Sequence, residues 1–344
     1  MIQMPLIDDS NQLLDRELMA EIASDYTQNN GHIIDKNGNT WIRWRVDGLD
    51  AWWRFFEEII DKPMGRRLAN SACDEEEHLL SQGIIEATGL FKASKVNKLV
   101  EKRWRVNGWG SPNYKKMLFS SKVQTPIMAG IFQAQKERMD STRYKMRWEN
   151  KSADDCILSF EQSSQIIQPA SGKLNSISPG IPYTVEVESD WKIDGVSHFL
   201  LPSGLFIRLQ QSCAGLTANL SDDERNCWPN LDDGFLSLAI ASKKLFIAGQ
   251  EIFLAADADG WKENCAAHFG SIGLSIPSTV EMIDSRGSVR LNFNELRNPA
   301  LSIGCLAGAW ERCEGRPVKV SYSISDQKHV ITLQSKYEMS QIGD

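Results

Sequence analysis

The spacing of apolar residues predicts alternating helices and strands in the first half of the chain. The stretch LDAWWRFFEEIID, residues 49–61, is amphipathic at helical spacing and ends just before Pro63. A later helix opens at Thr125-Pro126, where the first turn does not need the N–H that proline lacks. The expected elements are three helices, a strand, a helix and two strands, over residues 49–61, 74–80, 92–106, 114–120, 125–138, 143–149 and 155–161.

The second half shows a similar succession of patterns. Helical spacing marks residues 204–216 and 235–256, and a further helix is expected at 261–270. Residues 279–293 alternate in polarity around a Ser-Arg-Gly turn and predict a hairpin. A helix with Pro299 near its start and a pair of strands, residues 317–324 and 328–335, complete the half.

The two halves share residues as well as element order. Phe119 and Phe293 correspond at an offset of 174 residues, as do Gly130 and Gly304. The pair Glu137-Arg138 recurs at the same offset as Glu311-Arg312. We therefore expect an α+β fold of two diverged repeats, each an antiparallel sheet packed against helices, together forming a pseudo-dimer.

The stretch between the repeats is rich in Ser, Gln, Pro and Gly and lacks a sustained period, which predicts a linker. The expected divisions are an acidic N-terminal arm over 1–34, a first unit over 35–162, the linker over 163–182 and a second unit over 183–344. The arm could be extended or form one amphipathic helix.

Charge is unevenly distributed along these segments. The 344 residues carry a formal net charge of −7, made up of −5 over 1–34, +6 over 35–150 and −8 over 151–344. A basic block beside an acidic one could bind an external polyanion, or the two could attract each other within the chain. We favour the internal interpretation, and no motif for specific nucleic-acid recognition is found.

Several features favour a cytoplasmic protein. No apolar run reaches the 18 residues expected of a transmembrane helix. The N-terminus is acidic where a signal peptide begins with basic residues. The seven cysteines are odd in number and are not closely spaced as in a disulfide framework. They therefore favour free thiols in a reducing compartment.

Short motifs in the first half carry a family resemblance. They are Gly108-Trp109-Gly110, then Pro126 and Gly130 in the next helix, and the final Cys156-Ile-Leu-Ser-Phe-Glu. With these motifs, residues 40–162 resemble the vinyl-reductase-type (4VR) small-molecule-binding domain, related to subunits of the TRAPP transport particle; residues 195–336 do so less clearly. The resemblance implies a pocket-bearing sensor, carrier or assembly module, which in some members is linked to tetrapyrrole chemistry and often dimerises.

The same resemblance makes an inherited zinc site doubtful. The family often has a second cysteine about eight residues before the terminal one, and residues 149–155 contain none. In the second unit, Val330 stands near the position of Cys156, with His329 before it.

Tryptophan supplies the candidate ligand site. Seven of the eleven tryptophans lie between residues 41 and 148, where they could line a pocket for a flat ligand or a partner interface, or fill the core. The residues predicted to line the pocket are Trp104, Trp109, Tyr114, Trp148 and Cys156 in the first unit and Trp310 in the second, with Cys305 and His268 as weaker choices.

Other clusters carry less specific signals. Cys265 and His268 are one helical turn apart and, with Cys305 and Cys313, could supply a zinc site, but small buried thiols explain the cysteines better. The helix over 92–106 carries Lys92, Lys95, Lys98 and Lys102 on a face that could meet phosphates or lipid but is more typical of a solvated surface.

The sequence predicts a function only in outline. It lacks the signature motifs of nucleotide-binding, hydrolase and metalloprotease sites. We therefore expect a non-enzymatic binding protein, acting as carrier, assembly factor or scaffold for a hydrophobic or aromatic small molecule or a protein partner, with homodimerisation as a further expectation. The alternative is a cofactor-handling enzyme that acts on a tetrapyrrole-like ligand.

Overall fold

The computed structural model describes residues 14–88, 92–164, 168–228, 231–249, 251–326 and 328–337. Within these residues the chain is a mixed α+β protein in which helices pack against antiparallel sheets, as the sequence predicts. The helices are α1 (Arg16–Asp25), α2 (Val46–Ile60), α3 (Gly65–Ser81), α4 (Lys92–Asn107), α5 (Thr125–Asp140), α6 (Ser203–Ser212), α7 (Asp222–Asn226), α8 (Asp233–Ala248), α9 (Ala258–His268) and α10 (Pro299–Glu314). The strands are β1 (Tyr26–Asn29), β2 (His32–Asp35), β3 (Thr40–Arg45), β4 (Ser111–Asn113), β5 (Leu118–Ser120), β6 (Tyr144–Asn150), β7 (Asp155–Gln162), β8 (Ile181–Pro182), β9 (Lys192–Ile193), β10 (Val196–Pro202), β11 (Thr279–Met282), β12 (Val289–Phe293), β13 (Val318–Ser325) and β14 (Lys328–Ser335).

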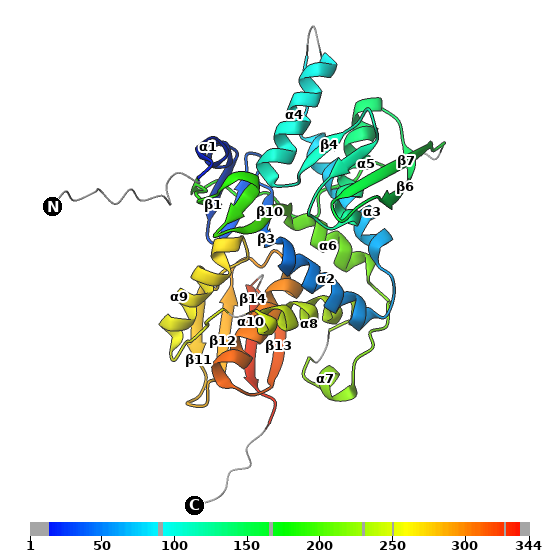
Figure 1. Cartoon of the computed structure of the whole chain (residues 1–344). Helices are drawn as coiled ribbons and strands as arrows, with labels where there is room; N and C mark the ends of the chain where they lie inside the picture. Colours follow the sequence, from blue (N-terminus) through cyan, green and yellow to red (C-terminus); the bar gives the residue numbers. More distant parts are fainter. Residues whose placement is uncertain are drawn as a thin grey trace, which may run out of the picture.

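A six-stranded antiparallel sheet lies at the centre of the molecule and contains strands from both halves of the chain (Figure 1). Its order is β8-β1-β2-β3-β10-β9. Strands β3 and β10 pair with Trp41 opposite Pro202 and Arg45 opposite His198. Each of these strands runs directly into a helix, α2 after β3 and α6 after β10. The halves are therefore joined by backbone hydrogen bonds between strands that are distant in sequence.

Two four-stranded antiparallel sheets lie on either side of this centre (Figure 1). The first has the order β4-β5-β7-β6 and the second the order β11-β12-β14-β13. Beside the first sheet, α5 packs on α3; beside the second sheet, α10 packs on α8. Both α5 and α10 have a proline in their first turn, Pro126 and Pro299. The order of the main elements after β10 thus parallels the order after β3, with the short helix α7 added.

The two helix pairs cross at very short distance, and a glycine makes each crossing possible. A Cβ atom on Gly130 of α5 would lie 2.1 Å from the carbonyl oxygen of Ala69 on α3. A Cβ atom on Gly304 of α10 would lie 2.0 Å from the carbonyl oxygen of Ala239 on α8. No side chain fits at these separations, so both crossings depend on the absence of a Cβ atom.

The region expected to be an acidic arm is structured from residue 16 onward. Helix α1 matches the helical alternative for this segment, and β1 and β2 form a hairpin around Asn30-Gly31, both with positive φ. The boundary expected between residues 34 and 35 falls inside β2, and residues 1–13 lie outside the described residues. The expected linker over 163–182 ends in β8, which pairs with β1.

Several predicted elements have different bounds in the structure; the helix predicted over 74–80, for example, begins at Gly65 as α3. Of the single strand predicted over 114–120, only β5 is a strand; residues 114–117 form the turn that joins it to β4, and Met117 there has a left-handed φ of 51°. The helix predicted over 235–256 ends at Ala248, where Gly249 leaves helical geometry. None of the helices in the described residues is long and apolar enough to cross a membrane.

Candidate functional site

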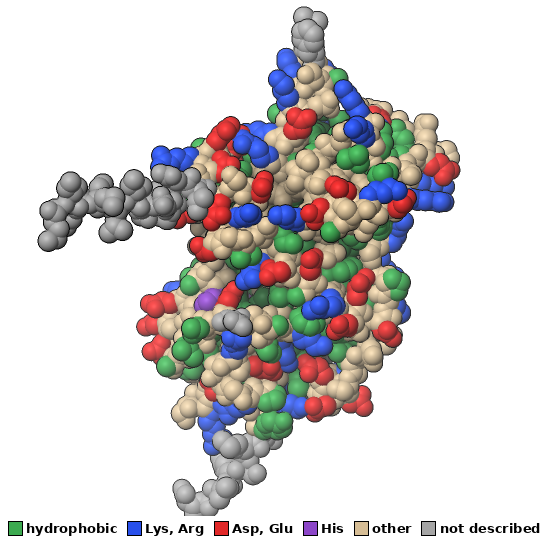
Figure 2. Space-filling model, viewed as in Figure 1, with side chains coloured by type: hydrophobic (Ala, Val, Ile, Leu, Met, Phe, Trp, Pro, Cys, Tyr) green, Lys and Arg blue, Asp and Glu red, His purple; other side chains and the backbone are tan. Residues whose placement is uncertain are grey.

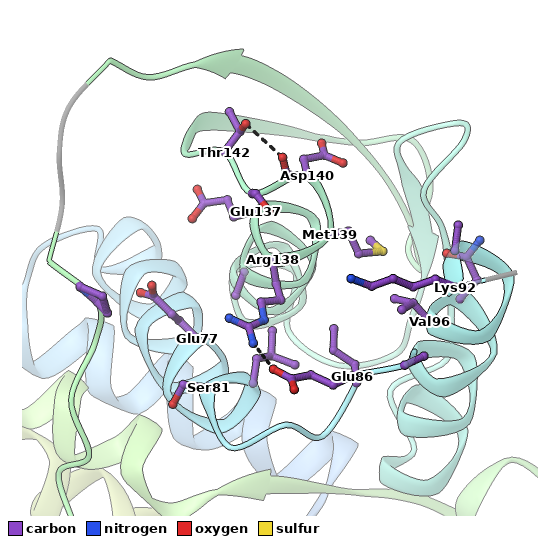
Figure 3. A pocket seen from close by; sticks show the side chains of 18 of the residues that line it. Glu77, Ser81, Glu86, Lys92, Val96, Glu137, Arg138, Met139, Asp140 and Thr142 are labelled. Atoms are coloured by element: carbon purple, nitrogen blue, oxygen red, sulfur yellow. Dashed lines mark hydrogen bonds and ion pairs between the residues drawn. The ribbon is translucent and has the colours of Figure 1, made fainter. Parts of the chain in front are cut away.

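A groove with a volume of about 1050 Å³ opens between α3, α4 and α5 (Figure 3). We call it the α4 groove. Its walls come from the C-terminal ends of α3 and α5, the loop after α3 and the first turns of α4. Its apolar lining includes the buried side chains of Leu80, Ile85 and Ala134 and the half-buried side chains of Val96 and Met139. An apolar group of a ligand would therefore leave water on entering it.

The groove exists because the two ends of α4 are packed differently. The C-terminal half is anchored in the core by Val100, Trp104 and Val106, all of which are buried. The N-terminal half projects from the body (Figure 1), and its side chains from Lys92 to Lys95 are exposed. This projecting half leaves a space between α4 and the end of α5.

Ion pairs cover most of the charged rim of the groove. Arg143 contacts Glu77 and lies 2.8 Å from Glu137, and its hydrogen bond to Glu77 is the main reason that its pKa is raised. Arg138 pairs with Glu86 across the groove (Figure 3). Glu77, Glu86 and Glu137 are thus each held in an ion pair by an arginine of the same chain.

Lys92 is the exception on the rim. Its side chain extends from α4 into the groove towards Met139 (Figure 3). Among the described residues it has neither a hydrogen bond nor an ion pair. A ligand in the groove could therefore pair with the ammonium group of Lys92, beside an apolar lining.

The six residues predicted to line a pocket lie elsewhere. Trp104, Trp109 and Trp310 are fully buried, and their indole nitrogens donate to internal oxygens at 2.7 to 2.8 Å. Cys156 is buried in β7. The remaining two, Tyr114 stacked on Phe132 and Trp148 beneath the guanidinium of Arg66, also lie outside the lining of the α4 groove.

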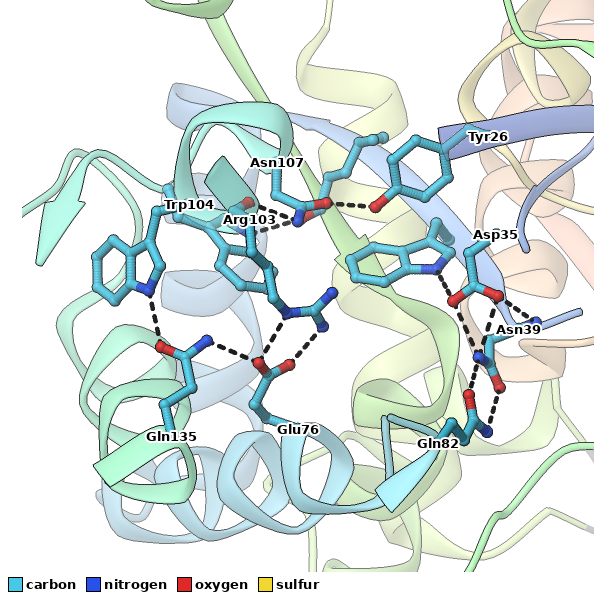
Figure 4. A network of polar contacts seen from close by, with 12 residues as sticks. Tyr26, Asp35, Asn39, Glu76, Gln82, Arg103, Trp104, Asn107 and Gln135 are labelled. Atoms are coloured by element: carbon cyan, nitrogen blue, oxygen red, sulfur yellow. Dashed lines mark hydrogen bonds and ion pairs between the residues drawn. The ribbon is translucent and has the colours of Figure 1, made fainter. Parts of the chain in front are cut away.

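These aromatic residues form part of the core because their polar atoms find partners inside it. Figure 4 shows the network: Arg103 donates to both carboxylate oxygens of Glu76, at 2.8 and 2.6 Å. Gln135 donates to the same carboxylate at 2.7 Å and accepts from Trp104. Asn107 accepts from Tyr26 at 2.6 Å, and burial raises the pKa of that tyrosine. A buried network satisfied in this way stabilises one arrangement of the core and leaves no group open to a ligand.

The residues considered for zinc are not arranged as a site. Burial raises the pKa of the Cys265 and Cys305 thiols to about 12, which disfavours the thiolate that zinc requires. The Cys313 thiol lies 3.3 Å from the carbonyl oxygen of Phe253, and His268 faces Glu251 at 3.2 Å. Nowhere in the described ranges do three or more His, Cys, Asp or Glu side chains form a group that could hold a metal ion.

Comparison with protein-family models, curated proteins and solved structures finds no match to this chain. The resemblance to 4VR and TRAPP-like domains therefore stays a prediction. The sequence does not predict the α4 groove, although the helical spacing over 92–106 places Val96 on the apolar side, away from the lysines. That pattern does not reveal that the inner face of the first turns lacks a packing partner.

Proposed function

We propose that this chain is a non-enzymatic binding protein and that the α4 groove is its binding site. The ligand is a hydrophobic or aromatic small molecule or a protein partner. The observation that carries the proposal is the groove itself, whose volume of about 1050 Å³ is close to the upper range for ligand sites. Its apolar lining and polar rim match the usual composition of such sites.

The charged groups of the groove support binding rather than catalysis. A general acid or base must reach a substrate atom and exchange its proton during the reaction. Glu77 and Glu137 are instead both held by Arg143, and Glu86 is held by Arg138. Their ion pairs fix the walls of the groove.

We further propose that the fold is a diverged duplication of a 4VR/TRAPP-like unit. The matching glycine crossings of α5 on α3 and α10 on α8 support it. A second pair of close approaches points the same way. A Cβ atom on Gly108 would lie 2.9 Å from the carbonyl oxygen of His198, and one on Gly273 would lie 2.2 Å from that of Trp41. His198 and Trp41 each stand five residues before the helix that follows their strand.

Contacts between the halves support a pseudo-dimer. The helix that directly follows the central strand of each half packs on the next long helix of the other half, α2 on α8 and α6 on α3. In one contact Trp52 donates to Ser242 at 2.9 Å, and in the other Arg208 pairs with Glu75 at 2.7 Å, both buried. Such reciprocal contacts are expected when two related units pair about a two-fold axis.

A cytoplasmic location is part of the proposal. All seven cysteines are free thiols, and five of them are buried. Proteins of oxidising compartments commonly use such cysteines as disulfides, whereas the cytosol keeps them reduced.

Native mass spectrometry of the purified full-length chain tests the binding site. Val96→Trp would fill the groove, whereas Lys98→Trp places the same side chain on an exposed part of α4 outside the lining. We expect a small molecule or protein partner to be retained by the wild type and by Lys98→Trp and lost from Val96→Trp. Equal retention by all three proteins would refute the site. A retained ligand with the absorption spectrum of a tetrapyrrole would favour the cofactor-handling alternative.

A further inference from the structure

The second half of the chain shows what fills the counterpart of the α4 groove. Counting back from the paired glycines Gly108 and Gly273 aligns α4 with α9. Val100 then corresponds to Cys265, and both side chains are buried. Four residues earlier, Val96 corresponds to Trp261.

Trp261 fills the space that the described residues leave open in the first half. Its side chain is 1% exposed, and its ring centroid lies 5.1 Å from that of Phe253, in the loop after α8. Phe253 is also buried and packs against Phe246 and Phe269. In the first half the loop after α3 contributes the smaller Ile85, and α4 contributes the smaller Val96. The α4 groove therefore lies where the second half holds a large aromatic ring.

The charges around the two sites are opposite. The segment that carries Trp261 in the second half is acidic, with Asp257, Asp259 and Glu263 close to it in sequence. The corresponding end of α4 carries Lys92, Lys95 and Lys98, and basic side chains gather along the projecting end of α4 in Figure 2. Of these lysines only Lys92 lines the groove, and it has no ion pair among the described residues, so an acidic group of a ligand beside it would be favoured.

We infer that the α4 groove is a docking site for an acidic protein segment that inserts one large aromatic side chain between Val96 and Ile85. The inference rests on the proposed function of this groove and names its partner. A protein segment is favoured because a polypeptide supplies the ring at the counterpart site.

A peptide from the chain itself provides a defined probe. The decapeptide AADADGWKEN, residues 255–264, combines an acidic character with the Trp261 side chain. Fluorescein-labelled peptide would be titrated with the full-length protein, and binding followed by fluorescence anisotropy. We expect saturable binding that weakens at least tenfold when the peptide carries Trp261→Ala, because a buried aromatic anchor typically dominates such an interface.

Variants of the protein locate the peptide in the groove. Val96→Trp should weaken binding at least tenfold, because the introduced ring occupies the space for the anchor, whereas Lys98→Trp should leave the groove free. Lys92→Gln should weaken binding about threefold, in keeping with one exposed charge contact, and this loss should shrink at high salt. Circular dichroism would confirm that each variant is folded.

The outcomes separate this inference from the proposed function. Absence of peptide binding, or binding that ignores the aromatic anchor or the Val96→Trp change, would overturn the inference. If a co-purified small molecule were still lost from Val96→Trp in the same preparations, the groove would remain the binding site and only the protein partner would be wrong. If neither the peptide nor the small molecule responded to Val96→Trp, both the inference and the proposed binding site would be refuted.

Discussion

Adding one methyl group at either helix crossing should lower the free energy of unfolding of the protein. The substitutions are Gly130→Ala in α5 and Gly304→Ala in α10. The new Cβ atoms would lie 2.1 Å and 2.0 Å from carbonyl oxygens of α3 and α8. Ordinary van der Waals contact needs 3.4 Å or more. Each helix pair would therefore have to separate by more than an ångström, because the obstructing atom belongs to a helix backbone.

The expected loss is about 2 kcal/mol for each substitution. Overpacking a close-packed interior costs about 1–3 kcal/mol, and a clash with backbone belongs at the upper end of that range. About 1 kcal/mol of this loss is offset because alanine has a higher helix propensity than glycine. Both terms apply equally to α5 and α10, so the two variants should lose similar amounts of stability.

Urea denaturation followed by far-ultraviolet circular dichroism measures the effect. Gly48→Ala in α2 is the matched control, since its Cβ atom would meet nothing nearer than the Cβ atom of Arg45 at 3.5 Å. The control should be neutral or more stable by up to about 1 kcal/mol. Crossing variants as stable as the control would refute the close helix packing. Destabilisation in only one half would contradict the proposed equivalence of the two units.

Two further predictions concern buried charge. Burial lowers the pKa of His32 to about 4, against about 6.5 in the unfolded chain, so stability should fall by about 3 kcal/mol as pH drops from 6.5 to 4. His32→Asn should remove this part of the pH dependence, and an unchanged slope in urea titrations would contradict the assignment. Glu76→Gln leaves the buried Arg103 without its counter-charge and should cost about 3–5 kcal/mol. Substituting both Glu76 and Arg103 with leucine should recover part of that loss. A loss below about 1 kcal/mol for Glu76→Gln would contradict the prediction, because Arg103 would then be neutralised by another group.

The local elements could be predicted from sequence because their signals are local. The helix at Thr125-Pro126 and the strand pairs over 143–149 with 155–161 and 317–324 with 328–335 lie close to their observed bounds. The hairpin around Asn30-Gly31 has a typical turn sequence, but the acidic residues around it predict an arm instead. The pairing of β3 with β10 has no such signal, since it joins strands distant in sequence.

The site was harder to predict than the fold. Trp104 and Trp109 were expected to line a pocket because indole combines apolar area with one polar atom. Gln135 and the carbonyl oxygen of Leu200 satisfy those polar atoms within the core. The groove depends instead on small side chains such as Val96 and on the direction in which α4 leaves the body, which no pattern in one sequence specifies.

A crystal structure of the natively purified protein with the AADADGWKEN peptide is the most direct test of the α4 groove as a binding site. The account predicts ordered density for the tryptophan ring between Val96 and Ile85, with an acidic residue near Lys92. An α4 helix closed onto Ile85, or peptide bound at another surface, would contradict it.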